Sequence, residues 1–387
     1  MLAILPAIRH LPTLSLLLVV LSLHILAWRW LREATGVRAS VARRRVLNLA
    51  LAFLIALMLA GFSLRLARVV LILPAGSWAI WLQAAALGWA LTFLVLFAGL
   101  WIVRRAPRFD PRRRRWLKAA AGAAAAAPVA LGGYGVFVER TALKANEVNL
   151  HLDHLPKDLD GMRLAQLTDI HLSPFLEVRE LLRAVEMANE FRPHIALVTG
   201  DLITGPGNWL ERCLGAVARL RPSGGTYGCL GNHEGYIRAE DRCTAQGRRL
   251  GIDFLRSEAR ALSFGSAIVN LVGVDYQRMG GPYLEGAGSL LREGSLNVLL
   301  SHNPDVFPVA ANLGFDLTIS GHTHGGQLAL NLLGQSLNVV RPFTPYVRGL
   351  YRKGPSAVYV SPGIGTVGIP VRIGAPPEVT LIRLCAT

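Results

Sequence analysis

The first part of the chain alternates between long apolar runs and short arginine-rich segments. A membrane-spanning helix needs about 20 mainly apolar residues, and the sequence predicts about four, over Leu11–Trp30, Val46–Leu64, Ala79–Val103 and Ala119–Val138. A cleaved signal peptide is an alternative interpretation of the first run. However, that run lacks a clear small-residue cleavage site and three more runs follow it. We therefore expect an α-helical transmembrane region over residues 1–144.

The second part of the chain has a different pattern, in which short runs typical of β-strands alternate with segments of helical periodicity. Strands are expected at Arg163–Leu167, Ile195–Thr199, Thr226–Leu230, Ala267–Val274, Asn297–Leu300, Asp316–Ser320, Ala357–Val360 and Val379–Leu384, and helices at Val178–Glu190 and Leu210–Leu220. Such alternation is typical of a layered α/β domain. The last two strands have no helix between them, which indicates a second sheet. We expect a two-sheet sandwich flanked by helices over residues 145–387.

The charge balance separates the same two parts. The chain has 387 residues and a net charge of +16. Residues 1–144 hold 19 Lys or Arg and 3 Asp or Glu, so the whole excess lies in the apolar part. A nucleic-acid-binding protein carries its basic residues on a folded domain. Here they separate apolar runs, as in membrane proteins, and we expect no nucleic-acid partner.

The basic residues are also distributed unevenly among the expected loops. Eight lie within residues 104–118 and five within residues 32–45, whereas the loop at residues 65–68 holds two. The positive-inside rule places the first and third loops in the cytoplasm. We therefore expect a multi-pass protein of the cell (inner) membrane, with everything after Val138 extracytoplasmic.

The four cysteines do not form a recognisable metal motif. Cys213, Cys229, Cys243 and Cys385 show no CxxC or other close spacing. Small buried apolar residues are their commonest role. A disulfide between Cys213 and Cys243 remains an alternative, because an extracytoplasmic domain would permit one.

Side chains that can bind metal follow one expected strand after another. Ligand sites in α/β sheets form at the carboxyl ends of the strands. A single Asp or His there usually caps a turn or is hydrogen-bonded in the core. However, histidine rarely occurs in the turns after so many strands of one domain. We therefore expect one shared site, built from Asp169, His171, Asp201, Asn232, His233, His302, His322 and His324.

The sequence around these residues resembles a known family, the calcineurin-like metallophosphoesterases. The resemblance rests on five blocks: DIH at Asp169–His171, GD at Gly200–Asp201, GNHE at Gly231–Glu234, SHNP at Ser301–Pro304 and GHTHGGQ at Gly321–Gln327. It covers about Arg163 to Leu384, and the ending Tyr359–Leu384 is similar to the bacterial membrane-anchored branch. One departure is Thr204, where the family usually has Asp or Asn.

The resemblance implies two divalent metal ions joined by a bridging hydroxide. By the family pattern, one ion is held by Asp169, His171, Asp201 and His324, and the other by Asp201, Asn232, His302 and His322. Carboxylate, imidazole and amide ligands suit manganese, iron or zinc better than magnesium or calcium.

The same pattern leaves His233 outside the metal ligands. It is the expected catalytic residue, because it can donate a proton to the leaving oxygen. Glu234 has two open interpretations: it orients His233, or it is an exposed residue that starts a helix.

Together these features predict a membrane-anchored, metal-dependent phosphoesterase, more a phosphodiesterase than a monoesterase. Its expected partners are the lipid bilayer and a phosphate-ester substrate, for which a lipid or envelope compound is a candidate. The alternative is a membrane sensor or transporter whose extracytoplasmic domain binds metal or phosphate. A binding module without catalysis would lack a ligand or His233, and none is missing. The oligomeric state stays open.

Overall fold

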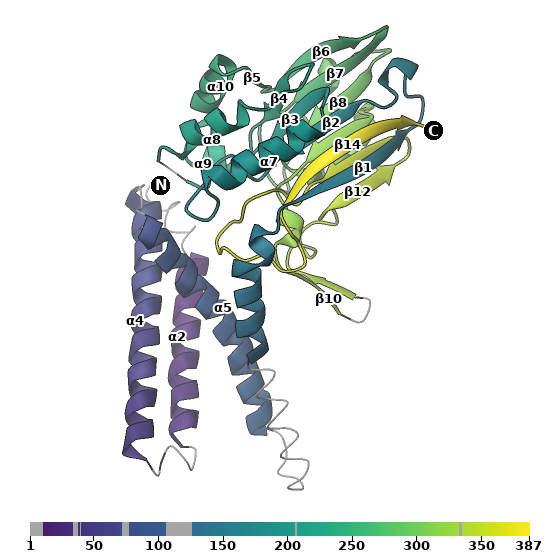
Figure 1. Ribbon diagram of the computed structural model, residues 1–387. Helices are drawn as coiled ribbons and strands as arrows, with labels where there is room; N and C mark the ends of the chain where they lie inside the picture. Colours follow the sequence, from purple (N-terminus) through teal and green to yellow (C-terminus); the bar gives the residue numbers. More distant parts are fainter. Residues whose placement is uncertain are drawn as a thin grey trace. The chain divides into compact units, whose positions relative to one another are not determined.

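The computed structural model describes residues 11–33, 38, 40–71, 77–105, 126–205, 207–332 and 335–387. The chain divides into two compact units, Met1–Tyr134 and Gly135–Thr387 (Figure 1). We describe each unit by itself.

The first unit contains the apolar helices. Three of them are long and apolar enough to cross a membrane, namely α2 (Leu11–Arg32), α4 (Val41–Leu71) and α5 (Ser77–Arg105). Apolar helices of spanning length are thereby confirmed at the first three expected spans. A further helix covers residues 126–137, so the fourth expected span, Ala119–Val138, lies partly outside the described residues.

These helices pack through small residues and polar contacts. A Cβ added to Gly61 on α4 would lie 2.3 Å from the Cβ of Ala86 on α5, so the two backbones approach closely, as is typical in lipid. On α2, His24 accepts a hydrogen bond of 2.9 Å from the Trp89 indole. Its ring also stacks on Phe93.

The second unit contains two six-stranded sheets. The first has the order β1-β14-β2-β3-β4-β5, in which β2 to β5 are parallel and β14 is antiparallel to β2. Its strands are β1 (Lys144–Leu152), β2 (Arg163–Leu167), β3 (Ile195–Thr199), β4 (Thr226–Cys229), β5 (Ile252–Phe254) and β14 (Glu378–Ala386).

The second sheet has the order β12-β13-β9-β8-β7-β6, with four parallel strands in the middle and an antiparallel strand at each edge. Its strands are β6 (Glu258–Phe264), β7 (Ala267–Gly273), β8 (Leu296–Leu300), β9 (Leu317–Ser320), β12 (Gly349–Lys353) and β13 (Ser356–Val360). A separate hairpin pairs β10 (Ala329–Leu332) with β11 (Gln335–Asn338).

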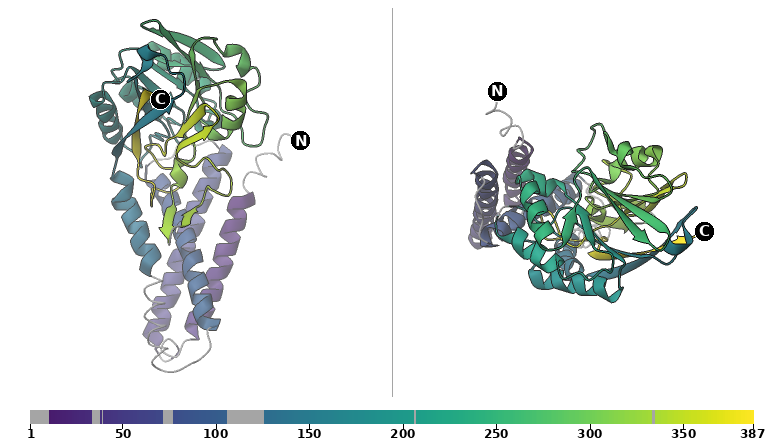
Figure 2. Two further views of the ribbon diagram at one scale, coloured as in Figure 1. Left: turned by 90° about the vertical axis from the view of Figure 1, so that its right-hand side faces the viewer. Right: turned by 90° about the horizontal axis from the view of Figure 1, so that it is seen from above.

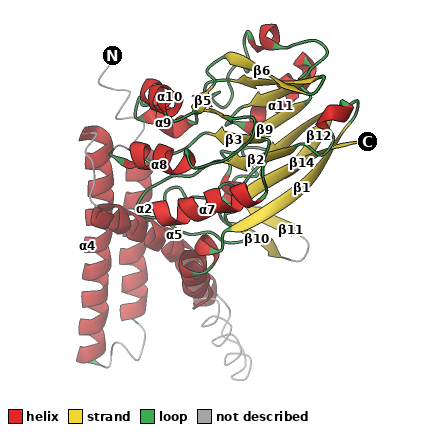
Figure 3. Cartoon of the chain, turned by 45° about the horizontal axis from the view of Figure 1, so that its top comes forward, coloured by secondary structure: helices red, strands yellow, loops and turns green. Residues whose placement is uncertain are grey.

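Helices lie on the outer faces of the two sheets (Figures 2 and 3). The first sheet is covered by α7 (Val178–Glu190), α8 (Trp209–Val217) and α10 (Glu240–Arg249), and the second by α11 (Phe307–Leu313). The short α9 covers Asn232–Tyr236. Among the described residues, 3-10 helices lie in the connections at Glu139–Thr141, Lys157–Leu159, Ala287–Leu290, Pro304–Val306 and His324–Gly326.

Alternating side chains in the strands create the layers of the sandwich. On β3, Ala196 and Val198 pack against the outer helices, whereas Ile195 and Leu197 enter the core between the sheets. This period of two follows from the pleat of a strand. The expected two-sheet sandwich flanked by helices is confirmed, and it directs the carboxyl ends of five parallel strands, β2, β3, β4, β8 and β9, into one region. All four cysteines are free.

Candidate metal centre

Every sequence-predicted site residue follows a strand of the sandwich. The first sheet contributes from the ends of β2, β3 and β4, and the second sheet from the ends of β8 and β9. The buried ones have side chains at most 6% exposed, and they are Asp169, His171, Asp201, Asn232, His302 and His324. The edge of the sandwich thus brings together side chains that are far apart in sequence, as expected for α/β folds.

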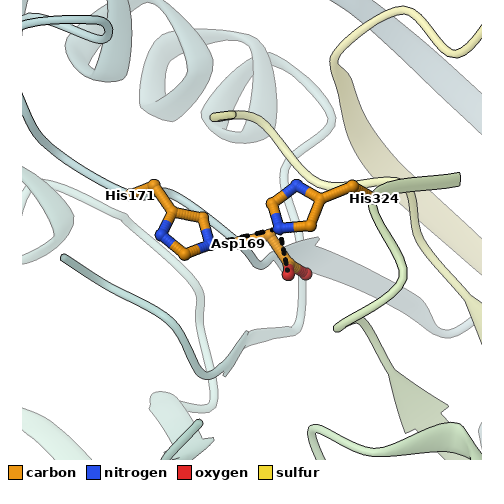
Figure 4. A group of neighbouring side chains, drawn as sticks. All are labelled: Asp169, His171 and His324. Atoms are coloured by element: carbon orange, nitrogen blue, oxygen red, sulfur yellow. Dashed lines mark hydrogen bonds and ion pairs between the residues drawn. The ribbon is translucent and has the colours of Figure 1, made fainter. Parts of the chain in front are cut away.

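One group of side chains joins Asp169, His171 and His324 (Figure 4). The Nε2 atoms of the two histidines are 3.1 Å apart, and His324 Nε2 is 3.3 Å from Asp169 Oδ1. Ligand atoms about 2.1 Å from one ion and about 90–110° apart lie roughly 3–3.4 Å from each other. The spacing therefore matches a set of metal ligands.

A second group surrounds the Asp201 carboxylate. Its Oδ2 atom is 3.1 Å from His302 Nε2 and 3.4 Å from His171 Nε2. Ligand atoms of Asp201, His302 and His322 lie within 4.8 Å of one another. Asp201 is therefore near histidines of both groups.

Several buried polar atoms of the site have no hydrogen-bond partner among the described residues. They include Asn232 Oδ1 and His302 Nε2. Buried polar atoms are normally paired, because an unpaired one costs about 1–3 kcal/mol. On His302 the other ring nitrogen, Nδ1, donates to the Thr199 carbonyl at 2.7 Å, so Nε2 is the nitrogen that faces the site. The residues present therefore fit a metal ion.

Burial keeps three of the imidazoles neutral. It lowers the pKa of His171, lowers that of His322 to about 3 and holds that of His324 well below its usual value. A metal binds the unprotonated imidazole. These three rings are thus in the form that ligation requires at neutral pH.

The two buried carboxylates attract positive charge into the site. Burial disfavours the ionised form of Asp201, but His302 and His233 outweigh it and hold the pKa of Asp201 well below its usual range. Burial also opposes a charge on His302, yet Asp201 and Asp169 raise the pKa of His302 to about 10. A cation at this place would compete with the His302 proton, since ligation releases protons.

The backbone at the site is strained. Left-handed φ angles occur at Asp169 (49°), His171 (48°), Asp201 (54°), His322 (75°) and His324 (52°). Residues other than glycine rarely adopt this conformation, which costs of order 1–3 kcal/mol at each position and concentrates at functional sites. The side chains of all five strained residues take part in the ligand groups described above.

His233 forms a third group of possible ligand atoms with His171 and Asp201, in which the atoms lie within 4.8 Å of one another. Its backbone N–H donates to Asp201 Oδ1 at 2.9 Å, and its Nδ1 donates to the Thr204 carbonyl at 3.0 Å. Since Nδ1 carries the proton, Nε2 remains for a substrate. The Thr204 hydroxyl lies 3.3 Å from His171 Nδ1, so the residue that departs from the family pattern contacts two site histidines.

Glu234 has neither of the two roles considered from sequence. It is fully buried, and its carboxylate accepts hydrogen bonds from the backbone N–H groups of Asp201, Leu202 and Gly231 at 2.8–3.0 Å. It therefore fixes the turn that carries Asp201 rather than the ring of His233. A Glu three residues into the GNHE block is the capping position of a helix, which was the available signal for this role.

Arg372 is a positioning residue that sequence reasoning missed. It is fully buried. Its guanidinium donates to the carbonyls of Pro362, Gly363, Gly365 and Ala375. Burial lowers its pKa to about 10, so it stays charged at neutral pH. The loop that it holds packs on Asp169, because Gly365 N–H donates to the Asp169 carbonyl at 2.7 Å.

Comparisons with known proteins place this geometry in a family. The sequence profile of the calcineurin-like phosphoesterases matches residues 162–326. The Bacillus subtilis metallophosphoesterase YkuE is 31% identical over 284 residues, which cover 71% of this chain and 98% of YkuE. The chain belongs to the calcineurin-like phosphoesterase family. A Danio rerio transmembrane protein with a metallophosphoesterase domain is also 31% identical, over 66% of this chain and 60% of its own length.

Membership of this family supports a metal-dependent phosphoric ester hydrolase. The family uses divalent metal ions, and the Asp and His groups described above are able to hold them. The apolar helices and the transmembrane relative indicate a membrane protein.

We predict that Gly231→Ala weakens metal binding. A Cβ at this position would lie 2.2 Å from Asp201 Oδ1, so the carboxylate must move. Displacing a group that orients a ligand typically costs about 10–100-fold in metal affinity, and titration of Mn²⁺ into the purified chain measures it. Gly235→Ala is the matched control, because its Cβ would meet Glu240 at 3.5 Å, an ordinary contact. Equal affinities in the two variants would contradict the assignment.

Proposed function

We propose that the chain is a membrane-anchored phosphoesterase that hydrolyses a phosphodiester or phosphomonoester at a centre of two divalent ions. In this proposal residues 1–144 are the anchor and residues 145–387 the catalytic domain. The observation that carries it is the convergence of seven side chains from five strand ends, at ligand spacing and with unpaired buried atoms. Manganese, iron and zinc suit this mixture of oxygen and nitrogen donors.

The assignment of ligands follows the two groups. Asp169, His171, Asp201 and His324 would hold one ion, and Asp201, Asn232, His302 and His322 the other. When bound, two such ions supply a water of lowered pKa and positive charge for the phosphate oxygens. The ligand set carries two carboxylates, so positive charge is left over to attract an anionic substrate.

The chain's own residues orient and protonate the substrate in this proposal. His233 would act as the general acid in its doubly protonated form, in which Nδ1 donates to the Thr204 carbonyl and Nε2 gives its proton to the leaving oxygen. Glu234 and Arg372 hold the backbone of Asp201 and the loop against Asp169, and so preserve the spacing of the ligands. A phosphodiester is favoured over a monoester, and a lipid or envelope compound is the candidate substrate class.

The membrane region supports anchoring more than transport. Ionisable groups within spans usually mark transport pathways. His24, a buried polar residue on α2, has its Nε2 hydrogen-bonded to the Trp89 indole and its Nδ1 to the Val20 carbonyl at 2.7 Å. Both ring nitrogens are therefore used in helix packing, which favours the enzyme over the alternative of a sensor or transporter.

The enzyme proposal predicts metal-dependent turnover. The purified full-length chain should hydrolyse bis-p-nitrophenyl phosphate with Mn²⁺, and a chelator should abolish the release of nitrophenol. His233→Ala should cut turnover by about 10²–10⁴, the usual contribution of a general acid, while the metal content stays unchanged because His233 is not a ligand.

His151→Ala is the control for that substitution, because His151 is an exposed histidine on β1. Absence of turnover with Mn, Fe, Zn, Co or Ni across mono- and diesters would refute the enzyme proposal. Loss of metal from His233→Ala would refute only the role given to His233.

We further propose that the catalytic domain faces the extracytoplasmic side of the inner membrane. The argument is the excess of basic residues within residues 104–118 over residues 65–68. Each Arg or Lys costs about 2.5–3.5 kcal/mol at the centre of a span, and such charges near spans stay in the cytoplasm. Residues 145–387 have no net charge and do not oppose translocation across the membrane, since long domains cross largely regardless of their charge.

This topology predicts the behaviour of two reporter fusions in a bacterial host. Alkaline phosphatase, which is active only outside the cytoplasm, should be active when it is fused after Thr387 and inactive when it is fused at Pro111. The opposite pattern would place the candidate site in the cytoplasm.

A further inference from the structure

Three exposed apolar side chains lie close together in sequence on the catalytic unit, beside the candidate site. They lie on residues 335–348, which comprise β11 and the segment that follows it. Leu337 is 57% exposed, Val339 is 56% exposed and Phe343 is 72% exposed. Single exposed apolar residues need no explanation, but grouped ones mark an interaction site. We call residues 335–348 the apolar segment.

Hydrogen bonds hold the segment that carries these exposed side chains against the rest of the unit. Asn338 Nδ2 donates to the Gly325 carbonyl at 2.9 Å. The Thr344 hydroxyl donates to Asp305, and the Val347 carbonyl accepts from the Thr323 hydroxyl. The apolar segment is therefore held at both ends against the turn of the GHTHGG block, next to His324. The fold presents the apolar side chains outwards while polar atoms of the same segment are paired.

The chain enters the catalytic unit beside the base of this hairpin. The helix of residues 126–137 leads out of the apolar run that is expected to span the membrane, and Phe137 and Val138 at its end are 77% and 51% exposed. Within the catalytic unit, the Gly135 carbonyl accepts from Arg372 N–H at 3.2 Å. A Cβ on Gly135 would lie 2.7 Å from Val371, so this part of the helix is packed directly on the domain.

The same loop continues into the hairpin. Residue Ile373, next to Arg372, accepts a hydrogen bond from Ala329 N–H at 2.7 Å and donates to the Gln327 carbonyl at 2.9 Å. Ala329 is the first residue of β10, and in Figure 1 the β10 hairpin projects from the sheets of the domain. If Gly135 lies at the end of a span, the base of the hairpin is at the level of the bilayer surface.

The charge of this region suits an anionic surface. The chain has no Asp or Glu between Asp316 and Glu378, whereas the same stretch holds five Lys or Arg, of which all but the buried Arg372 are exposed. Two of these, Arg341 and Arg348, lie in the apolar segment and are exposed. Arginine beside exposed aromatic and aliphatic residues is typical of elements that lie in the headgroup layer of a bilayer.

We propose that the apolar segment is a second membrane contact, in which Leu337, Val339 and Phe343 insert into the lipid–water interface of an anionic bilayer. This inference rests on the proposed membrane anchoring and deepens it. The contact would hold the GHTHGG turn, and with it the candidate metal centre, at the depth of the lipid headgroups. A phosphate ester in that layer would reach the site without leaving the membrane.

A photo-crosslinking experiment tests this contact without requiring turnover. The full-length chain, with benzoylphenylalanine at position 343, is placed in nanodiscs that contain phosphatidylglycerol and irradiated. We expect covalent adducts of phospholipid at position 343. The matched control places the same probe at position 250, since Leu250 is also an exposed apolar residue, 44% exposed at the end of α10. We expect no lipid adduct there.

Two outcomes would overturn the proposal. Adducts between two copies of the chain at position 343 would make the apolar segment an interface of the protein with itself. Equal lipid labelling at positions 343 and 250, or none at either, would show that the segment does not lie in the bilayer. Because an inactive enzyme would give the same adducts, failure here is distinguishable from failure of the phosphoesterase proposal.

Discussion

The burial of two carboxylates in one small site is the constraint on which the rest of the catalytic unit depends. Asp169 and Asp201 are 0% and 2% exposed, and each lies within 3.5 Å of a histidine nitrogen. Buried charges are costly unless they are paired and hydrogen-bonded. The site meets this cost with histidines and with backbone donors, such as His322 N–H on Asp169 at 2.9 Å. A pair of divalent ions would complete the compensation.

The scaffold around the carboxylates can be understood as a response to that constraint. Ligands from two sheets must meet within a few ångströms, so several of them accept left-handed backbone conformations. Glu234 stabilises the Asp201 turn by accepting hydrogen bonds from backbone N–H groups. Arg372 stabilises the loop behind Asp169 by donating hydrogen bonds to backbone carbonyls. Arg372 also contacts Gly135 through its backbone N–H. The same loop therefore connects the entry of the chain, the metal centre and the base of the apolar hairpin.

Much of the fold could be predicted from the sequence where burial imposes a simple pattern. The bounds of β2, β3 and α7 agree with expectation to the residue, because buried apolar runs end at polar turns. Strands β1, β6 and β12 were not expected, since they lie at sheet edges and mix exposed with buried positions. The ligand types were visible at the strand ends. Glu234, Thr204 and Arg372 were not assigned their contacts, because their partners are mostly backbone atoms that only the fold brings together.

The metal content of Asp201→Asn tests the central claim most directly. Asp201 is the carboxylate that the two proposed ligand sets share, so its replacement should weaken both sites at once. The full-length chain is loaded with Mn²⁺, desalted and analysed by inductively coupled plasma mass spectrometry, beside Asp253→Asn, which alters a carboxylate paired with Arg260 at 2.8 Å. The account predicts two ions per chain in the native protein and in Asp253→Asn, and loss of both from Asp201→Asn. Two ions retained in Asp201→Asn would contradict it.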